Sequence, residues 1–239
     1  MTAATPAPEI TAERTSDSGC VFLDLDGPIL DTADRNFRVH QALVGELGGR
    51  MAVEQAPFWD MKRAGCSSAE LLQFNPEVAV RADEFKRRWL EEIEAPRWLE
   101  SDTVHAGVLP ALEWLAGRWR IVLVTLRQQR AHLIAQLERL ELTGFFSMIL
   151  SDSPAIGPGW ETKRRLIAHS GFDPFGVMVG DTEIDIRAGK LAGLGTVAVT
   201  CGIRDEPQLR KENPDVVADR LADLQRLDLG SIFKRDAKT

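Results

Sequence analysis

Short apolar runs recur along the chain and alternate with segments of helical periodicity. The runs are bounded by polar residues or glycine, as is typical of strands buried on both faces of a sheet. They are CVFL at 20–23, IVLV at 121–124, MIL at 148–150, VMV at 177–179 and TVAV at 196–199. The helical repeats between them are Leu133, Ile134, Leu137 and Leu140, and Ile184, Ala188, Leu191 and Ala192. This alternation predicts an α/β fold with a mostly parallel, Rossmann-like doubly wound sheet.

The interval between Asp34 and Thr103 has a different pattern, with helical periodicity and no convincing strand. Its apolar faces are Phe37, His40, Val44 and Leu47, and then Phe85, Trp89 and Ile93. The amphipathic segment LPALEWLAGRWR at 109–120 leads from this interval to the next strand. We therefore predict an all-helical insertion within an α/β core. The predicted parts are a leader without ordered structure at 1–19, the insertion at 34–103 and the core at 20–33 and 104–239.

Composition and charge then narrow the classes of function. The 239 residues are 44% hydrophobic, which is enough for a buried core, and their formal net charge is −7. No stripe of lysine and arginine is interleaved with aromatic residues, so we expect no nucleic-acid partner.

The apolar spans and the cysteines indicate the cellular compartment in which the protein is expected. The chain has no apolar span of membrane length, and the leader lacks the apolar region of a signal peptide, so we expect no membrane partner. Its three cysteines lie far apart without a C-x-x-C pair, which favours free thiols in a reducing compartment. We therefore predict a cytoplasmic protein.

Carboxylates follow two of the predicted strands, at the edge where doubly wound sheets bind ligands. Asp24 and Asp26 come directly after VFL, and residues two apart in an extended segment point to the same side. The cluster GDTEID at 180–185 follows VMV and supplies Asp181 and Asp185. Such close negative charges repel one another unless a cation lies between them, and Mg²⁺ prefers oxygen ligands. The sequence therefore predicts one Mg²⁺ site built from two strand ends.

Thr125 and Lys163 complete a predicted anion pocket. Thr125 ends IVLV and offers a hydroxyl and a backbone N–H, whereas Lys163 opens the helical stretch KRRLIAHS and offers a cation. Gly27 and Gly180 adjoin the acids and leave room for tight turns and close backbone approach. Together these groups supply the nucleophile, charge neutralisation and positioning that phosphoryl transfer requires. Arg127, close to Thr125, is a further candidate for contact with substrate.

In this order, the motifs resemble those of the haloacid dehalogenase-like superfamily of aspartate-nucleophile phosphotransferases, over about 150 residues of core. DLDGPILDT resembles the first motif, VTLR the second, Lys163 the lysine of the third and VGDTEIDIRAGKLAG the fourth. The stretch from GVMVGDTEID to VVADRLADL, at 176–224, is similar to the tail of the phosphoglycolate phosphatase-like branch. The resemblance implies that the helical insertion is a cap that shields the site.

The resemblance also implies a role for each residue. Asp24 is the expected nucleophile, which forms an aspartyl-phosphate, and Asp26 is the expected general acid/base. Thr125 and Lys163 are expected to hold the phosphoryl oxygens, with Arg127 as a further phosphate-binding candidate. The expected metal residues are Asp24, Asp26 through its backbone carbonyl, Asp181 and, more often in the outer shell, Asp185.

Some features depart from the pattern of the family. Pro28 stands where threonine is common and stiffens the loop after Gly27, and Cys201 replaces a frequent tryptophan. The insertion of roughly 70 residues is short for this branch. Plainer interpretations also exist, in which Thr125 and Asp185 cap helices and Lys163 and Arg127 lie on a solvated surface.

The predicted function is Mg²⁺-dependent hydrolysis of a small organic phosphate monoester. Two alternatives stay open: a phosphomutase of the β-phosphoglucomutase type, which shares these residues, and a non-catalytic binding protein on the same fold. Hydrolytic dehalogenation is disfavoured, because it does not need the acid/base that Asp26 supplies. We expect the inserted helices to set specificity and to move about hinges at 32–34 and 102–107. Neither the oligomeric state nor the identity of the ester follows from the sequence.

Overall fold

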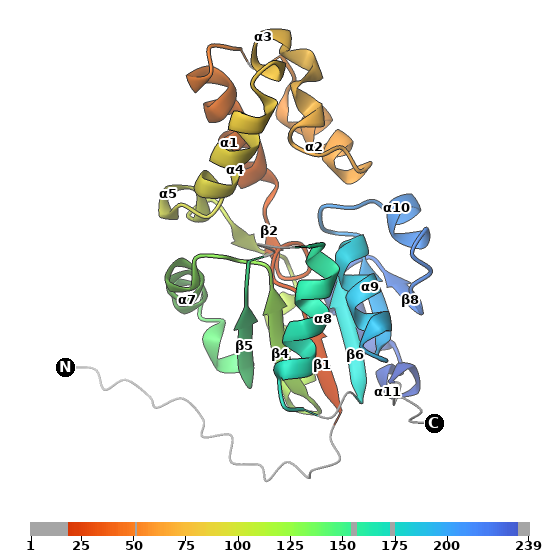
Figure 1. Cartoon of the computed structure of the whole chain (residues 1–239). Helices are drawn as coiled ribbons and strands as arrows, with labels where there is room; N and C mark the ends of the chain where they lie inside the picture. Colours follow the sequence, from red (N-terminus) through yellow and green to blue (C-terminus); the bar gives the residue numbers. More distant parts are fainter. Residues whose placement is uncertain (1–18, 51, 154–156, 173–174, 234–239) are drawn as a thin grey trace, which may run out of the picture.

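A parallel sheet forms the core of the computed structural model, which describes residues 19–50, 52–153, 157–172 and 175–233. Apart from Gly19, the predicted leader lies outside these residues. The strands of this sheet are β1 (Cys20–Leu23), β4 (Arg120–Thr125), β5 (Met148–Ser151), β6 (Gly176–Gly180), β7 (Gly195–Val199) and β8 (Val216–Ala218). Within the described residues they lie in the order β5-β4-β1-β6-β7-β8, and every pairing is parallel (Figure 1).

Alternating side chains of the strands pack against helices on both faces of the sheet. The helices of the core are α6 (Val108–Ala116), α7 (Arg130–Arg139), η2 (Thr143–Phe145), α8 (Gly159–His169), α9 (Glu183–Leu191), α10 (Glu206–Arg210), η3 (Leu221–Arg226) and α11 (Leu229–Ile232). Val21 and Leu23 belong to a core cluster that also takes residues from α6, α7 and η3, whereas Phe22 lies in a second cluster with Ile167 of α8 and Ala188 of α9. The sheet is therefore doubly wound, as the apolar runs predict.

A helical insertion leaves the core and returns to it through two short strands. These are β2 (Leu30–Asp31) and β3 (Thr103–Val104), which pair antiparallel beside the C-terminal edge of the sheet (Figure 1). The inserted helices are α1 (Ala33–Glu46), α2 (Gln55–Arg63), η1 (Glu70–Phe74), α3 (Pro76–Ala79), α4 (Ala82–Glu92) and α5 (Pro96–Leu99). The two apolar faces predicted from the sequence meet in a separate core, where the ring of His40 contacts those of Phe85 and Trp89.

Hydrogen bonds on two sides dock the insertion on the core, and those of Arg63 and Glu94 are examples. The guanidinium of Arg63, at the end of α2, donates to the carbonyl oxygens of Thr200 (2.8 Å) and Gly202 (2.7 Å). On the other side, the carboxylate of Glu94 accepts the backbone N–H groups of residues 128 and 129, at 2.9 Å each, where α7 begins. A carboxylate is favourable at a helix N-terminus because of the helix dipole. These contacts hold the insertion against the C-terminal edge of the sheet.

The structure confirms the predicted fold class, an α/β core with a helical insertion. The predicted strands are found within about a residue of their expected bounds, but β2, β3 and β8 were not predicted, because each has only two or three residues. Lys163 does not open its helix as expected, since α8 already begins at Gly159, after Pro158. In the described part of the chain, no helix is long and apolar enough to cross a membrane.

Replacing Phe85 by alanine tests the core of the insertion. Phe85 is fully buried, so we expect Phe85→Ala to lower the free energy of unfolding by about 3–5 kcal/mol, measured by chemical denaturation. Phe74 of the same insertion is 41% exposed, and Phe74→Ala should cost less than about 1 kcal/mol. Equal losses in the two variants would contradict the packing described here.

Candidate active site

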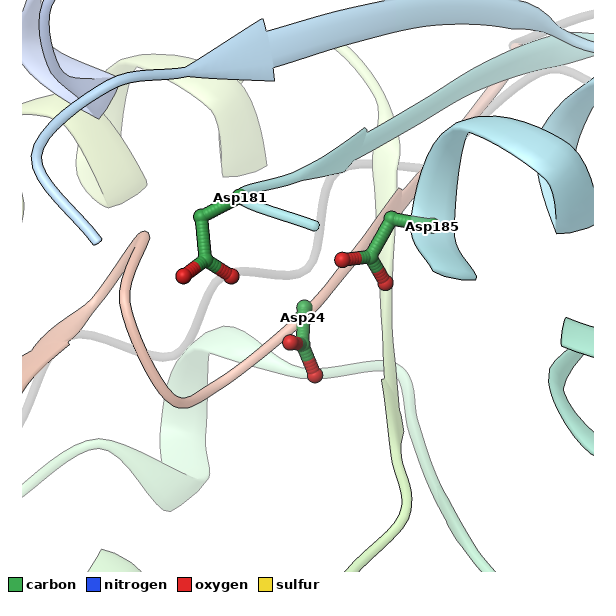
Figure 2. A group of neighbouring side chains, drawn as sticks. All are labelled: Asp24, Asp181 and Asp185. Carbon is green, nitrogen blue, oxygen red and sulfur yellow. The ribbon is translucent and has the colours of Figure 1, made fainter. Parts of the chain in front are cut away.

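Three buried carboxylates meet at the C-terminal edge of the sheet. Asp24 directly follows β1 and donates its backbone N–H to the carbonyl oxygen of Val179 (3.0 Å), while Asp181 directly follows the neighbouring β6. Asp185 comes from the first turn of α9. The chain adds strands on opposite sides of β1, so a crevice forms at this point of the sheet. Figure 2 shows the three carboxylates turned toward one small space, and ligand atoms from all three lie within 4.8 Å of one another.

The side chain of Lys163 bridges two of these acids. Its Nζ lies 2.8 Å from Oδ1 of Asp24 and 2.6 Å from Oδ1 of Asp185. The second oxygen of Asp185 accepts the backbone N–H (3.1 Å) and the hydroxyl (2.6 Å) of Thr182, in a capping box that begins α9. Both oxygens of Asp185 are thus occupied by groups of the protein.

Asp181 has one oxygen that the described residues leave without a hydrogen bond. Its Oδ2 accepts the backbone N–H of Ile203 at 2.6 Å, whereas its buried Oδ1 has no such partner in the described part of the chain. A buried polar oxygen without a partner is unfavourable, so Oδ1 is available to a ligand.

Glycines allow the backbone to pass close to these acids. Gly27 has a φ of 103°, a left-handed conformation that favours glycine, and a Cβ at this position would overlap the carboxylate of Asp181. A Cβ on Gly202 would overlap the same carboxylate, and one on Gly180 would overlap Asp185. The close approach predicted for Gly27 and Gly180 is therefore observed, and Gly202 is a further case that the sequence did not indicate.

The charges of this cluster do not balance. Among the described residues, its ion pairs all run to Lys163, so in their ionised forms three carboxylates face one ammonium, with two negative charges in excess. Burial raises the pKa of Asp24 to about 7 although Lys163 opposes the shift, and burial with the nearby Asp24 and Asp185 raises the pKa of Asp181 well above its usual value. A divalent cation fits this cluster, because it would balance the charge and bind the free oxygen of Asp181.

Asp26 is held by different counter-charges. Its Oδ2 accepts Nε of Arg127 (2.6 Å), and its Oδ1 accepts Nη2 of Arg127 (2.8 Å) and Nη2 of Arg35 (2.8 Å). Burial alone would raise the pKa of Asp26, but the two guanidinium groups outweigh it and hold this pKa well below its usual range. From the sequence alone, a metal ion is the expected means of relieving the repulsion between Asp24 and Asp26. The structure adds two arginines that balance the charge of Asp26 by themselves.

A cavity of about 300 Å³ opens over these groups. Its wall from the core includes five of the predicted site residues: Asp24, Asp26, Thr125, Arg127 and Lys163. The insertion supplies Arg35, Asn36, Leu90, Ile93 and Glu94. Asp181 and Asp185 join the site through their contacts with the acids and Lys163, so the structure brings all seven predicted residues together.

Residues of the insertion that face this cavity were not predicted. Arg35 is the clearest case, since it is buried and bonded to Asp26 although the sequence places it in an ordinary polar turn of a helix. Arg127 was predicted as a phosphate-binding candidate, and its guanidinium is paired with Asp26 in this structure. Its contact with substrate stays a prediction.

Comparison with known proteins identifies the family. A family profile described as haloacid dehalogenase-like hydrolase matches residues 19–193, which is more than half of the chain. The chain belongs to the haloacid dehalogenase-like hydrolase family. A second profile, for HAD-hydrolase-like proteins, matches residues 164–224. The superfamily predicted from the four motifs is confirmed.

Relatives of this haloacid dehalogenase-like hydrolase carry phosphatase names. A probable phosphatase IndB of Dickeya dadantii is 25% identical over 213 residues, which cover 85% of this chain and 90% of that protein. A phosphoglycolate phosphatase of Pseudomonas syringae pv. tomato is 26% identical over 225 residues, 89% of this chain and 79% of that protein. The haloacid dehalogenase-like protein SP0104 of Streptococcus pneumoniae shares the fold, with a TM-score of 0.70 at 18% identity over 89% of this chain and 99% of that one.

Adding a methyl group at Gly27 tests the close packing around Asp181. We expect Gly27→Ala to lower the free energy of unfolding by about 1–3 kcal/mol, because φ is positive and the new Cβ would displace the carboxylate. Gly144→Ala is the matched control, since no atom lies within 4 Å of its added Cβ, and it should change stability by less than about 1 kcal/mol. Thermal and denaturant unfolding measure both, and a neutral Gly27→Ala would contradict the geometry.

Proposed function

We propose that this haloacid dehalogenase-like hydrolase is a Mg²⁺-dependent phosphatase that hydrolyses a small organic phosphate monoester through an aspartyl-phosphate. The observation that carries the proposal is the buried cluster of Asp24, Asp181 and Asp185, which Lys163 only partly neutralises, beside a cavity of substrate size. The phosphatase names of two relatives support the same reaction.

The described side chains fit a hard divalent cation. Asp24, Asp181 and the backbone carbonyl of Asp26 would hold Mg²⁺, and the unpartnered Oδ1 of Asp181 is the oxygen that most needs such a partner. Asp185 would act on the site through Lys163, because both of its oxygens are engaged. When bound, the ion supplies charge neutralisation for the phosphoryl group.

The chemistry of the protein's own residues follows in two steps. An oxygen of the Asp24 carboxylate attacks phosphorus, the bond from phosphorus to the ester oxygen breaks, and Asp26 gives a proton to the leaving oxygen. Arg35 and Arg127 favour the ionised form of Asp26, so in this proposal Asp26 takes up that proton when the negatively charged phosphate ester binds beside it. Water then attacks the phosphorus, Asp26 takes a proton from it, and the bond to Asp24 breaks. Inorganic phosphate leaves, and both aspartates return to their starting states.

The remaining polar groups of the cavity have positioning roles. Lys163 touches the proposed nucleophile and is within reach of the phosphoryl oxygens, while Thr125 at the end of β4 offers its hydroxyl and backbone N–H to the same group. The leaving group would face the insertion, whose residues Asn36, Leu90 and Ile93 line the other wall of the cavity. The phosphoglycolate phosphatase among the relatives makes 2-phosphoglycolate the first ester to try.

A phosphate-release screen with Mg²⁺ tests the reaction. We expect the wild-type protein to release inorganic phosphate from at least one small monoester, and Asp24→Asn to reduce the rate by at least about 10³-fold, because it removes the nucleophile. Asp31→Asn is the matched control, since Asp31 belongs to the same segment but is exposed, and it should keep wild-type activity.

Two results of this screen would contradict the proposal. One is an Asp24→Asn variant as active as wild type, and the other is no release of phosphate from any ester. Isomerisation of a sugar phosphate without net release of phosphate would instead establish the phosphomutase alternative.

Thermal unfolding tests the metal site without measuring activity. We expect saturating Mg²⁺, at about a hundredfold excess over its dissociation constant, to raise the wild-type Tm by roughly 5–10 °C. Asp181→Asn removes one of the repelling charges, so it should raise the Tm of the metal-free protein and abolish the Mg²⁺-dependent increase. Glu183→Gln, which lies outside the cluster and pairs with Arg204, should keep the increase. An undiminished shift in Asp181→Asn would exclude this metal site.

A further inference from the structure

Four charged side chains form a closed group at the base of the insertion. This hinge quartet consists of Asp26, Arg35, Asp102 and Arg127. Both arginines bond to Asp26, and both also face Asp102: Nε of Arg35 lies 3.3 Å from its Oδ1, and Nη2 of Arg127 lies 3.6 Å from its Oδ2. Two acids and two bases balance, so the quartet has no net charge of its own, in contrast to the neighbouring metal-binding cluster.

The members of the quartet come from both sides of the hinge. Arg35 lies in the first turn of α1, just after β2, and Asp102 directly precedes β3, so these two mark the places where the chain leaves and re-enters the core. Asp26 follows β1, and Arg127 follows β4. The quartet therefore connects the insertion to the ends of two strands of the sheet.

A glutamine of the core holds two members of the quartet, Asp102 and Arg127. Gln136 of α7 donates from Nε2 to Oδ2 of Asp102 (2.7 Å) and accepts Nη2 of Arg127 at its Oε1 (3.3 Å). The side chains of Arg35, Asp102 and Arg127 are at most 5% exposed, whereas that of Asp26 is 30% exposed. Asp26 is thus the most exposed member of the quartet; Arg35 and Arg127 also line the cavity but are almost fully buried, and Asp102 lies behind them.

Stability is a poor explanation for this arrangement. Buried ion pairs gain little over well-packed apolar side chains of similar size, because desolvation of the charges offsets their attraction. Such a network does fix geometry. Three hydrogen bonds from two arginines restrict the carboxylate of Asp26, and the bidentate pairing with Arg127 also fixes the plane of that carboxylate.

We propose that Arg35, Asp102 and Arg127 are positioning residues, which place the carboxylate of Asp26 for proton transfer. The proposal rests on the proposed function, in which Asp26 protonates the leaving oxygen and then takes a proton from water. Arg35 holds Asp26 from the insertion and Arg127 holds it from the core. Asp26 therefore keeps its orientation for proton transfer only while the insertion stays in the position described above. Moving α1 away would remove the hydrogen bond from Arg35, one of the three that hold the carboxylate of Asp26.

Leaving-group chemistry separates this role from a structural one. An alkyl phosphate expels an alkoxide, which needs a proton as the bond to phosphorus breaks, whereas para-nitrophenyl phosphate expels a stable phenolate that needs none. A misplaced Asp26 must therefore slow the first reaction far more than the second. A variant that merely loosens the fold slows both reactions alike.

The test compares kcat/KM for two substrates in Arg35→Gln and Asp102→Asn. The substrates are para-nitrophenyl phosphate and the alkyl phosphate that the wild-type protein hydrolyses best. We expect losses of about 10²-fold with the alkyl ester and less than about tenfold with the aryl ester. We also expect a burst of one equivalent of nitrophenolate, because hydrolysis of the aspartyl-phosphate still needs Asp26 to accept a proton from water.

Two further variants keep the test decisive. Arg38→Gln is the matched control, because Arg38 lies on the same helix, is exposed and pairs with Asp34, and it should leave both kcat/KM values unchanged. Arg127→Lys keeps the charge but loses the bidentate hydrogen bonds to Asp26. It should therefore show the same preference for the aryl ester, and it keeps the test valid if the other variants fold poorly.

The outcomes distinguish the two proposals. If the wild-type protein is active but the quartet variants lose the same factor on both substrates, or lose nothing, the positioning role is wrong and the proposed function stands. If the wild-type protein releases phosphate from no ester, both proposals fall.

Discussion

Repulsion between buried carboxylates is the constraint on which the rest of this site depends. Burying a charge is costly unless an opposite charge accompanies it, and the ends of β1 and β6 gather four aspartates in one region. The structure divides them into two groups with separate counter-charges. Asp24, Asp181 and Asp185 share Lys163 and remain short of positive charge, whereas Asp26 is fully balanced by Arg35 and Arg127. Two aspartates only two residues apart thereby acquire different electrostatic surroundings.

The fold makes this division possible. In a parallel sheet, neighbouring strands end at the same edge, so Asp24 and Asp181 become adjacent although they are far apart in the sequence. Gly27 and Gly202 leave space that side chains would fill, and α8 places Lys163 over the acids. The insertion then contributes a second counter-charge for Asp26, because Arg35 enters the site from the first turn of α1. Residues of both the core and the insertion therefore hold Asp26.

Most of this site can be predicted from the sequence, because the residues concerned stand next to recognisable strands and helices. Each strand is a short apolar run, and Asp24, Thr125, Lys163 and Asp181 stand in motifs attached to those runs or to the helix after them. The supporting charges are different. Arg127 reaches Asp26 across 101 positions of the chain, and nothing near Arg35 in the sequence distinguishes it from an exposed helical arginine. Pairings of that kind depend on where the insertion docks, which periodicity does not describe.

Burial of the hinge quartet also bears on how the contact between insertion and core responds to ionic strength. Dissolved ions screen exposed charges within about 10 Å at 0.1 M salt but act far less on buried pairs. The ion pair of Arg87 with Glu91 on the outside of the insertion is more than half exposed, so salt weakens it readily. The buried arginines of the quartet are shielded from the solvent ions. We therefore expect the alignment of insertion and core at Asp26 to persist at salt concentrations that weaken the surface ion pairs around it.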